Sequence, residues 1–246
     1  MFKYQLLIIQ DIRAVKSARE IKHITRAQKI SELVLIKVVS RLKVGITEVA
    51  LARFIVHNFK QRGITALAFE PIVAFGKNTA DIHHWATATK LKVGDTVMFD
   101  FGCTVQGYCS DMTRTYFFGT PLVRQKRVYA AVLEAQNRAL KLLIGGERRA
   151  GKVDSSARTF LFKKFGRRAF PHGLGHGVGM AIHEWPNFKP GSTDVLKPGM
   201  IMTVEPGLYF KGWGGVRIDD MVVITKTGCD IITTVSKKLN DVVVHE

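Results

Sequence analysis

The sequence has 246 residues, of which 46% are hydrophobic, and it carries a net charge of +17. This length can bury a full core as one large domain or two tightly joined halves, and no apolar run approaches the roughly 20 residues of a membrane span. The charge would suit nucleic acid or the ribosome, but no stacking aromatics or nucleic-acid motif accompany it, so we expect a solvated basic surface.

Four segments have apolar side chains at helical spacing. The first opens with Ser17 and Glu20 in the relation of a capping box, and glycines follow the ends of the others. The expected helices are 16–42, about 45–62, 125–143, and a segment that follows 151–154 and ends near residue 164.

The chain repeats part of itself. Ile82, His83 and Trp85 recur 100 positions later, and a second set recurs with an offset of 105. That set matches Leu91, Lys92, Gly94, Asp100 and Gly102 with Leu196, Lys197, Gly199, Glu205 and Gly207. We therefore expect two copies of one α-β unit, with the 125–143 helix between them. Two copies facing across an axis would bring their acids into one central site.

The first acidic hairpin contains Asp100 and Asp111. If its strands fold about Val105 and Gln106, residues whose numbers sum to 211 are paired, and the two aspartates face each other. Two close carboxylates on an apolar sheet need a cation to stay ionised. On this hairpin alone, one acid at a strand end and one in a turn is an equal alternative.

Two loops contain histidines. In residues 75–89, either His83 or His84 could project into a site. In residues 170–185, His172 and His176 are four apart, but the surrounding glycines disfavour the helix of a helical zinc motif. A glycine-rich strand lets a backbone or a ligand approach closely, so a histidine there can reach a metal.

The second acidic hairpin comprises an apolar strand, 200–205, and a strand predicted over 215–224. Alternation places Arg217 and Asp219 on one face and Asp220 on the other. Aligning Asp111-Met112 of the first hairpin with Asp220-Met221 of the second favours Asp220 as the site acid instead. The sequence leaves this register open.

The motifs DFG, SDMTRT, HGLGHGVG, IHEWP, VEPGLY and GVRIDD, in this order, resemble the pita-bread metallopeptidases. This family includes methionine aminopeptidase, aminopeptidase P and Xaa-Pro dipeptidase, and the resemblance is strong from about Phe69 to Gly228. It implies an α+β fold of duplicated units, with a curved antiparallel sheet flanked by helices. We expect a short N-terminal extension, 1–15, and a catalytic domain, 16–246.

The resemblance also implies a centre of two divalent ions that activate a water. Mn²⁺ suits carboxylate-rich ligation, and Co²⁺, Fe²⁺ or Zn²⁺ are substitutes. By the match, His83 and His183 flank the scissile bond, and Glu205 could also shuttle a proton. His172 and Arg217 match substrate-side positions of the proline-specific branch. The implied metal ligands are Asp100, Asp111, His176, Glu205 and Asp219, the last replacing the glutamate usual in the family.

The function implied is removal of the N-terminal residue from peptides by cleavage of Xaa-Pro bonds. Methionine aminopeptidase is the alternative, and the alternative from another class is an inactive pita-bread protein that binds nucleic acid. Partners are peptides with a free N-terminus, with a homodimer and a contact with nucleic acid or the ribosome also considered. Three cysteines without metal-type spacing and an N-terminus unlike a signal peptide indicate a cytoplasmic protein with free thiols.

Overall fold

The computed structural model describes residues 10–245, and its four long helices follow the sequence pattern closely. Ser17 and Glu20 form the predicted capping box at the start of the first helix. Gly63 and Gly166 follow the ends of two helices with φ values of +74° and +80°. The helices are α2 (Ala18–Val39), α3 (Glu48–Gln61), α4 (Val123–Ile144) and α5 (Ala150–Phe165).

The start of α5 differs from the prediction, because residues 151–154 lie inside the helix. A Cβ atom on Gly151 would come within 2.4 Å of the Ser192 carbonyl oxygen. This glycine therefore lets the first helical turn approach a neighbouring loop. Asp154 accepts two hydrogen bonds from Arg158 one turn later, which favours the helix at this position.

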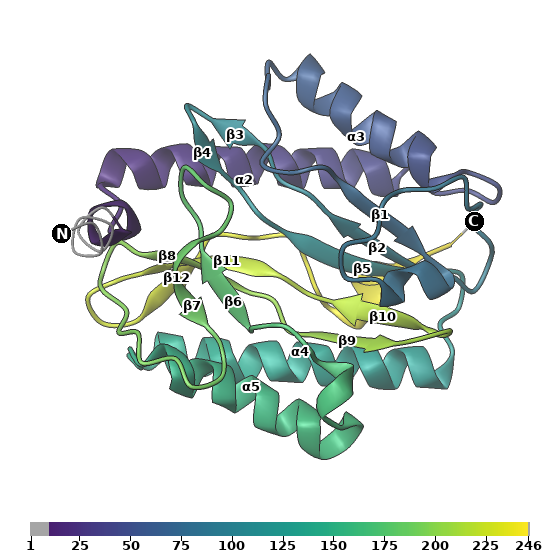
Figure 1. Cartoon of the computed structure of the whole chain (residues 1–246). Helices are drawn as coiled ribbons and strands as arrows, with labels where there is room; N and C mark the ends of the chain where they lie inside the picture. Colours follow the sequence, from purple (N-terminus) through teal and green to yellow (C-terminus); the bar gives the residue numbers. More distant parts are fainter. Residues whose placement is uncertain (1–9, 246) are drawn as a thin grey trace.

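The strands are short and lie between the two pairs of helices (Figure 1). Figure 1 shows α2 and α3 along one side of the strands and α4 and α5 along the other. The strands of the first half are β1 (Ile72–Phe75), β2 (Thr96–Asp100), β3 (Thr104–Val105), β4 (Tyr108–Cys109) and β5 (Thr113–Phe118). Those of the second half are β6 (Gly175–Gly177), β7 (Glu184–Phe188), β8 (Ile201–Val204), β9 (Gly207–Phe210), β10 (Gly214–Arg217), β11 (Asp220–Ile224), β12 (Cys229–Ile231) and β13 (Val243–Val244). Short 3₁₀ turns are η1 (Gly76–Ala80), η2 (Arg167–Ala169) and η3 (Leu239–Val242).

Two sheets form the centre of the fold. One has the order β1-β2-β5-β13 and the other β12-β11-β8-β6-β7. The pairs are antiparallel except for β13, which lies parallel to β5. The main apolar cluster contains Leu35, Leu51, Val132 and Leu161 from the four helices together with Phe99 from β2, so the two halves share one core.

The duplication is present in the backbone. Helices α2 and α4 both have 22 residues. Gly94 and Gly199 both have φ of +92°, ahead of β2 and β8 respectively. The expectation that α4 separates the two copies is therefore wrong. By length and position it is the first helix of the second copy, as α2 is of the first.

The first acidic hairpin has a different register from the one predicted. Strand pairing places Asp100 opposite Thr113, and Thr104 opposite Cys109, so paired residue numbers sum to 213. The hairpin turns at Gln106 and Gly107, whose φ values are +53° and +80°. Positive φ at both central residues fits the tight turn that matches strand twist. Asp111 is consequently displaced by two residues from the position facing Asp100.

The second acidic hairpin is divided where one strand was predicted. Residues 214–217 pair with β9, and residues 220–224 pair with β8. The change of partner occurs at Ile218 and Asp219. Extending the β8–β11 register by one residue brings Asp219 opposite Glu205.

Residues 10–16 contact the second half of the chain, while residues 1–9 of the predicted N-terminal extension lie outside the described part. Val15 bridges to Met200, and the Lys16 amide donates to the Gly199 carbonyl. Arg13 and Lys16 both pair with Glu184.

Cys103, Cys109 and Cys229 are free thiols, as expected; the first two are buried and Cys229 is partly exposed.

In the described part of the chain, no helix is both long enough and apolar enough to cross a membrane.

Candidate metal centre

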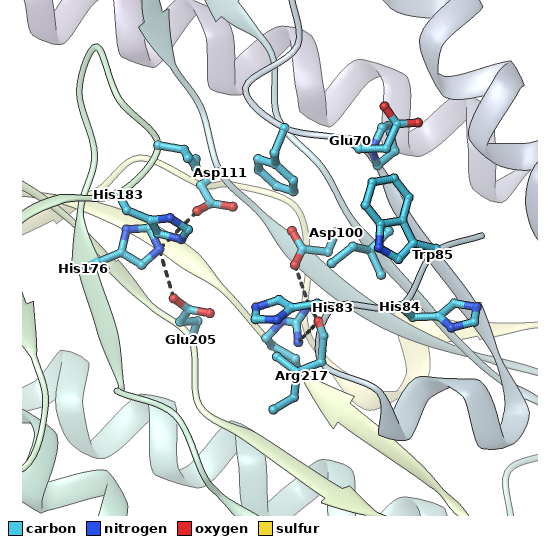
Figure 2. Close-up of a pocket in the computed structure, with 15 residues that line it drawn as sticks. Glu70, His83, His84, Trp85, Asp100, Asp111, His176, His183, Glu205 and Arg217 are labelled. Carbon is cyan, nitrogen blue, oxygen red and sulfur yellow. Dashed lines mark hydrogen bonds and ion pairs between the residues drawn. The ribbon is translucent and has the colours of Figure 1, made fainter.

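A pocket of about 250 Å³ lies where the two halves meet, and acids from both acidic hairpins line it (Figure 2). Most of the residues singled out in the sequence line this pocket, but His172 and Asp219 do not. Its lining is Phe69, Glu70, Pro71, Ile72, Ile82, His83, His84, Trp85, Asp100, Asp111, His176, Ile182, His183, Glu205 and Arg217.

His176 lies between two acids from different halves of the chain, as Figure 2 shows. Its Nε2 is 3.2 Å from Glu205 Oε1 and 3.6 Å from Asp111 Oδ2. The other ring nitrogen, Nδ1, lies 3.0 Å from the Gly177 carbonyl oxygen. That contact requires a proton on Nδ1, which leaves Nε2 to face the acids. The imidazole therefore faces one acid from each half of the chain.

The glycines around His176 make room for its strand. A Cβ atom on Gly175 would lie 2.1 Å from the Thr203 carbonyl oxygen, and one on Gly177 would lie 2.7 Å from that of Trp185. Backbones of β7 and β8 therefore approach β6 as only glycine permits. The prediction of a glycine-rich strand in place of a helix is confirmed.

Asp100 is held by Arg217. Arg217 Nη2 donates to Asp100 Oδ2 over 2.5 Å, and both side chains are almost fully buried. The other oxygen, Asp100 Oδ1, is buried without a hydrogen-bond partner. A buried, unpartnered carboxylate oxygen is costly in a protein interior, and a cation would satisfy it.

Asp219 and Asp220 have opposite surroundings. Asp220 accepts from Arg114 over 2.6 Å and also pairs with Lys237, so its charge is neutralised by the protein. Asp219 is buried with an unpartnered Oδ1, and the charges of Asp111 and Glu205 act on it. The register that the sequence left open therefore places Asp219, and not Asp220, beside the other acids.

The acids cannot all be ionised in the absence of a cation. Burial, followed by the charge of Asp100, raises the pKa of Asp111 well above its usual range. Burial and the charges of Asp111, Glu205 and Asp100 do the same to the pKa of Asp219. The site must therefore take up protons or divalent cations.

His176 and Glu205 stabilise each other's charged forms. Burial alone would lower the pKa of His176, but the hydrogen bond and charge of Glu205 raise it to about 9. Burial alone would raise the pKa of Glu205, but His176 lowers it to about 2. Without metal, these shifts favour imidazolium and carboxylate for the pair.

The donor chemistry fits divalent metal ions, although the side chains are now engaged with one another. In residues 10–245, no three His, Cys, Asp or Glu side chains are arranged to hold an ion as they stand. In this state His176 and Arg217 are paired with oxygens of Glu205 and Asp100. Two buried carboxylate oxygens lack partners, and carboxylates with one imidazole are typical ligands of such ions. A metal would replace the histidine proton and relieve the repulsion among the acids.

We expect the rise in melting temperature on adding Mn²⁺ to grow as the pH is raised above about 5. The folded protein holds Asp111 and Asp219 protonated at pH values where the unfolded chain, with pKa near 3.9, has lost those protons. The metal-free fold therefore loses stability as pH rises in this range, while metal competes with fewer protons. Thermal unfolding with EDTA and with Mn²⁺ measures the difference. Asp111→Asn serves as the control, and in this variant the Mn²⁺-induced rise in melting temperature should depend less on pH. A rise that is independent of pH in the wild-type protein would contradict the expectation.

His83 and His183 lie at the pocket mouth. Both are exposed, and the His183 ring packs edge-on against the His176 ring, 4.4 Å between centroids. Partial loss of solvent around the ring and the charge of His176 lower the pKa of His183, which favours its neutral form. His84, the alternative in the first loop, also lines the pocket but is bonded to Glu48 over 2.9 Å.

Glu48 fixes the loop that contains His83. Its buried carboxylate accepts from the backbone amides of Phe75 and Thr87 and from the Asn78 side chain, in addition to His84. Burial would raise the pKa of Glu48, but these hydrogen bonds lower it. The carboxylate thus holds both ends of the loop against the start of α3.

His172 reaches the centre through Tyr209. His172 Nδ1 lies 2.7 Å from the Gly173 carbonyl oxygen and therefore donates, so Nε2 accepts from the Tyr209 hydroxyl over 2.9 Å. Tyr209 in turn accepts from Arg217 Nη1 over 2.8 Å. Burial lowers the pKa of His172, consistent with the neutral form that accepts this bond. His172 and Arg217 are therefore linked, although only Arg217 lines the pocket.

Several site residues were missed by the sequence reasoning. Ile82, Trp85 and Ile182 belong to the internal repeat, which was a usable signal, yet only the histidines were assigned there. The repeat does not predict equal roles: Trp85 lines the pocket with 75% of its surface exposed, whereas Trp185 packs against the core. Tyr209 was in a quoted motif without an assigned role. Glu48 had no signal beyond its place at a helix start.

Comparisons with known proteins agree with this arrangement. Residues 22–226 match the metallopeptidase family M24. An Xaa-Pro dipeptidase from Pyrococcus horikoshii is 37% identical over 232 residues, which cover 94% of this chain and 66% of that protein. The X-Pro aminopeptidase structure from Thermotoga maritima superposes with a TM-score of 0.90 at 35% identity, over 97% of this chain and 66% of that one. The structure of prolidase from Pyrococcus furiosus superposes with a TM-score of 0.89 at 36% identity, over 93% of this chain and 68% of that one.

The duplicated α-β units, the antiparallel sheets and these structural neighbours define a pita-bread protein. The chain belongs to metallopeptidase family M24. The chain spans about two thirds of the length of the curated relatives it matches: its matched part covers 66% of the Pyrococcus horikoshii protein and 66% of an uncharacterized peptidase from Staphylococcus aureus.

Proposed function

We propose that this chain is the catalytic part of a metal-dependent exopeptidase that removes the N-terminal residue from peptides by cleaving Xaa-Pro bonds. The observation that carries the proposal is the cluster of buried acids around His176, with two unpartnered carboxylate oxygens. The relatives described as Xaa-Pro dipeptidase and X-Pro aminopeptidase support the choice of bond.

Two divalent ions, most suitably Mn²⁺, would be held in this site, with Co²⁺, Fe²⁺ or Zn²⁺ as substitutes. When bound, such ions supply Lewis-acid activation of a water and of the scissile carbonyl. The residues that would hold them are Asp100, Asp111, His176, Glu205 and Asp219.

The remaining residues would place the substrate and move protons. Neutral His183 can donate a hydrogen bond to the carbonyl oxygen of the scissile bond as charge develops there. His83, which also lines the pocket, would flank the same bond. Ile82 and Ile182 line the pocket, and their apolar side chains would suit a proline ring. Glu205 is suited to carry a proton from the attacking water to the departing proline nitrogen.

Arg217 and His172 would act together in this proposal. Arg217 orients Asp100 and, through Tyr209, fixes the hydrogen-bond direction of His172. The proline-specific branch resembles this chain at both positions, which favours Xaa-Pro cleavage over removal of methionine.

Several of the basic residues have partners within the chain, so their charge alone does not require nucleic acid. Several lie over aromatic rings, where cation and π face attract each other. Examples are Arg124 over Trp213, 4.3 Å from the ring centroid, and Arg158 over Phe170, 4.4 Å. Free thiols at Cys103, Cys109 and Cys229 support a reducing compartment such as the cytoplasm.

We expect chelated protein to regain hydrolysis of Xaa-Pro dipeptides or Xaa-Pro-Xaa tripeptides when Mn²⁺ is added. Paired peptides of the two lengths and Met-Ala-Ser, assayed with and without the ion, test this. Metal-dependent cleavage before proline supports the proposal, and the ratio of dipeptide to tripeptide rates gives the subtype. Cleavage after Met alone would favour methionine aminopeptidase, and full activity with chelator present would exclude the mechanism.

A further inference from the structure

Gln136 lies inside α4 and binds the backbone beside two of the site's acids. Its side chain is fully buried. Nε2 donates to the Val204 carbonyl over 2.9 Å and to the Ile218 carbonyl over 3.2 Å. Val204 directly precedes Glu205, and Ile218 directly precedes Asp219. One amide group therefore joins the two strand segments at the residues directly before these acids.

The amide binds where the strand changes its pairing partner. At Ile218 and Asp219 the chain leaves β9 and begins to pair with β8, so the regular strand hydrogen bonds are interrupted. Buried carbonyl groups at such a break need donors from elsewhere. Gln136 supplies both donors from a neighbouring helix, and α4 thereby fixes the separation of the two segments.

The amide is itself held in one orientation. Gln136 Oε1 accepts from Lys237 Nζ over 2.6 Å, and Lys237 also pairs with Asp220. Because the oxygen is bound to an ammonium group, the Nε2 hydrogens must face the two carbonyls. Arg114 adds a third anchor by donating to the Asp219 carbonyl over 2.6 Å.

We propose that Gln136 is a positioning residue that sets the spacing of Glu205 and Asp219 and thereby the affinity of the site for divalent metal. This rests on the proposed function for the identity of the ligands. A group that fixes metal ligands typically contributes about 10- to 100-fold in metal affinity or activity. Because one amide holds both strand segments, its loss displaces both carboxylates at once.

The test compares Gln136→Leu with Gln125→Leu in the full chain. Gln125 is a matched control: it lies in the same helix, is buried, and also donates two hydrogen bonds and accepts one. Its partners, Gly94, Thr96 and Leu122, do not line the pocket. Mn²⁺ titration followed by electron paramagnetic resonance gives the affinity and number of bound ions, and thermal unfolding in EDTA gives the stability.

We expect both variants to lose stability, but only Gln136→Leu to lose Mn²⁺ affinity, by about 10- to 100-fold. Gln136→Glu keeps the size and the Lys237 partner but removes both donors, and it should show the same loss if the leucine variant does not fold. Wild-type Mn²⁺ affinity in Gln136→Glu, or an equal loss in Gln125→Leu, would overturn the proposal. Wild-type protein that binds Mn²⁺ without cleaving peptides would refute the proposed function and leave this inference standing.

Discussion

Replacing Asp219 with asparagine is expected to abolish metal-dependent peptide cleavage while raising the melting temperature of the metal-free protein. Burial and four neighbouring carboxylates act against the charge of Asp219, and its Oδ1 has no partner. An amide of the same shape is neutral without taking up a proton on folding, so the metal-free protein gains stability, but it is a poorer metal ligand. Mutation of a residue that only supports a ligand already lowers metal affinity or activity by about 10- to 100-fold. Loss of a ligand itself should therefore lower metal affinity by more than about 100-fold.

The adjacent residue provides the matched comparison. Asp220→Asn breaks a buried pair with Arg114 and Lys237, and removing one partner of such a pair typically costs about 3 to 5 kcal/mol of unfolding free energy. We expect Asp220→Asn to lose stability and to keep Mn²⁺ binding to its folded fraction. Urea unfolding in EDTA and Mn²⁺ titration of both variants measure this contrast. If Asp220→Asn lost the metal and Asp219→Asn kept it, the assignment of the fifth ligand would be reversed.

The register of the first acidic hairpin shows where local pattern stops being informative. Pairings that sum to 211 or 213 differ by two residues, so every side chain keeps its face and the alternation of apolar residues fits both. The distinguishing feature is the turn, which needs positive φ at two central residues, and Gly107 satisfies one of them. A turn placed at Gln106 and Gly107, on the basis of that glycine, would have predicted the observed pairing.

The duplication was predictable because each copy contains its own evidence. Gly94 and Gly199 adopt the same positive φ, and Leu91 and Leu196 are both buried, as the repeat requires. The choice between Asp219 and Asp220 was not predictable in this way. It depends on Arg114, which belongs to the other hairpin and meets Asp220 only in the folded chain. Gln136 is a similar case, since helical periodicity identifies a buried position but not the carbonyls it will meet.

Arg217→Lys is expected to reduce the kcat/KM for Xaa-Pro peptides by about 10- to 100-fold. Lysine keeps a positive charge near Asp100 but lacks the planar fork that also donates to Thr113 and Tyr209. The Asp100 carboxylate would lose its fixed orientation, and Tyr209 would no longer be held toward His172. Steady-state kinetics with Mn²⁺ at saturation measure the change.

Arg148→Lys is the control for this substitution. Its guanidinium also donates to neighbouring oxygens, the carbonyls of Thr225 and Gly228, but it does not line the pocket. It should therefore retain wild-type kinetics at a modest cost in stability. Equal kinetics for Arg217→Lys and Arg148→Lys would mean that the position needs only a positive charge. A selective loss at Arg217 would instead support a site in which the guanidinium fork orients Asp100 on one side and the Tyr209–His172 pair on the other.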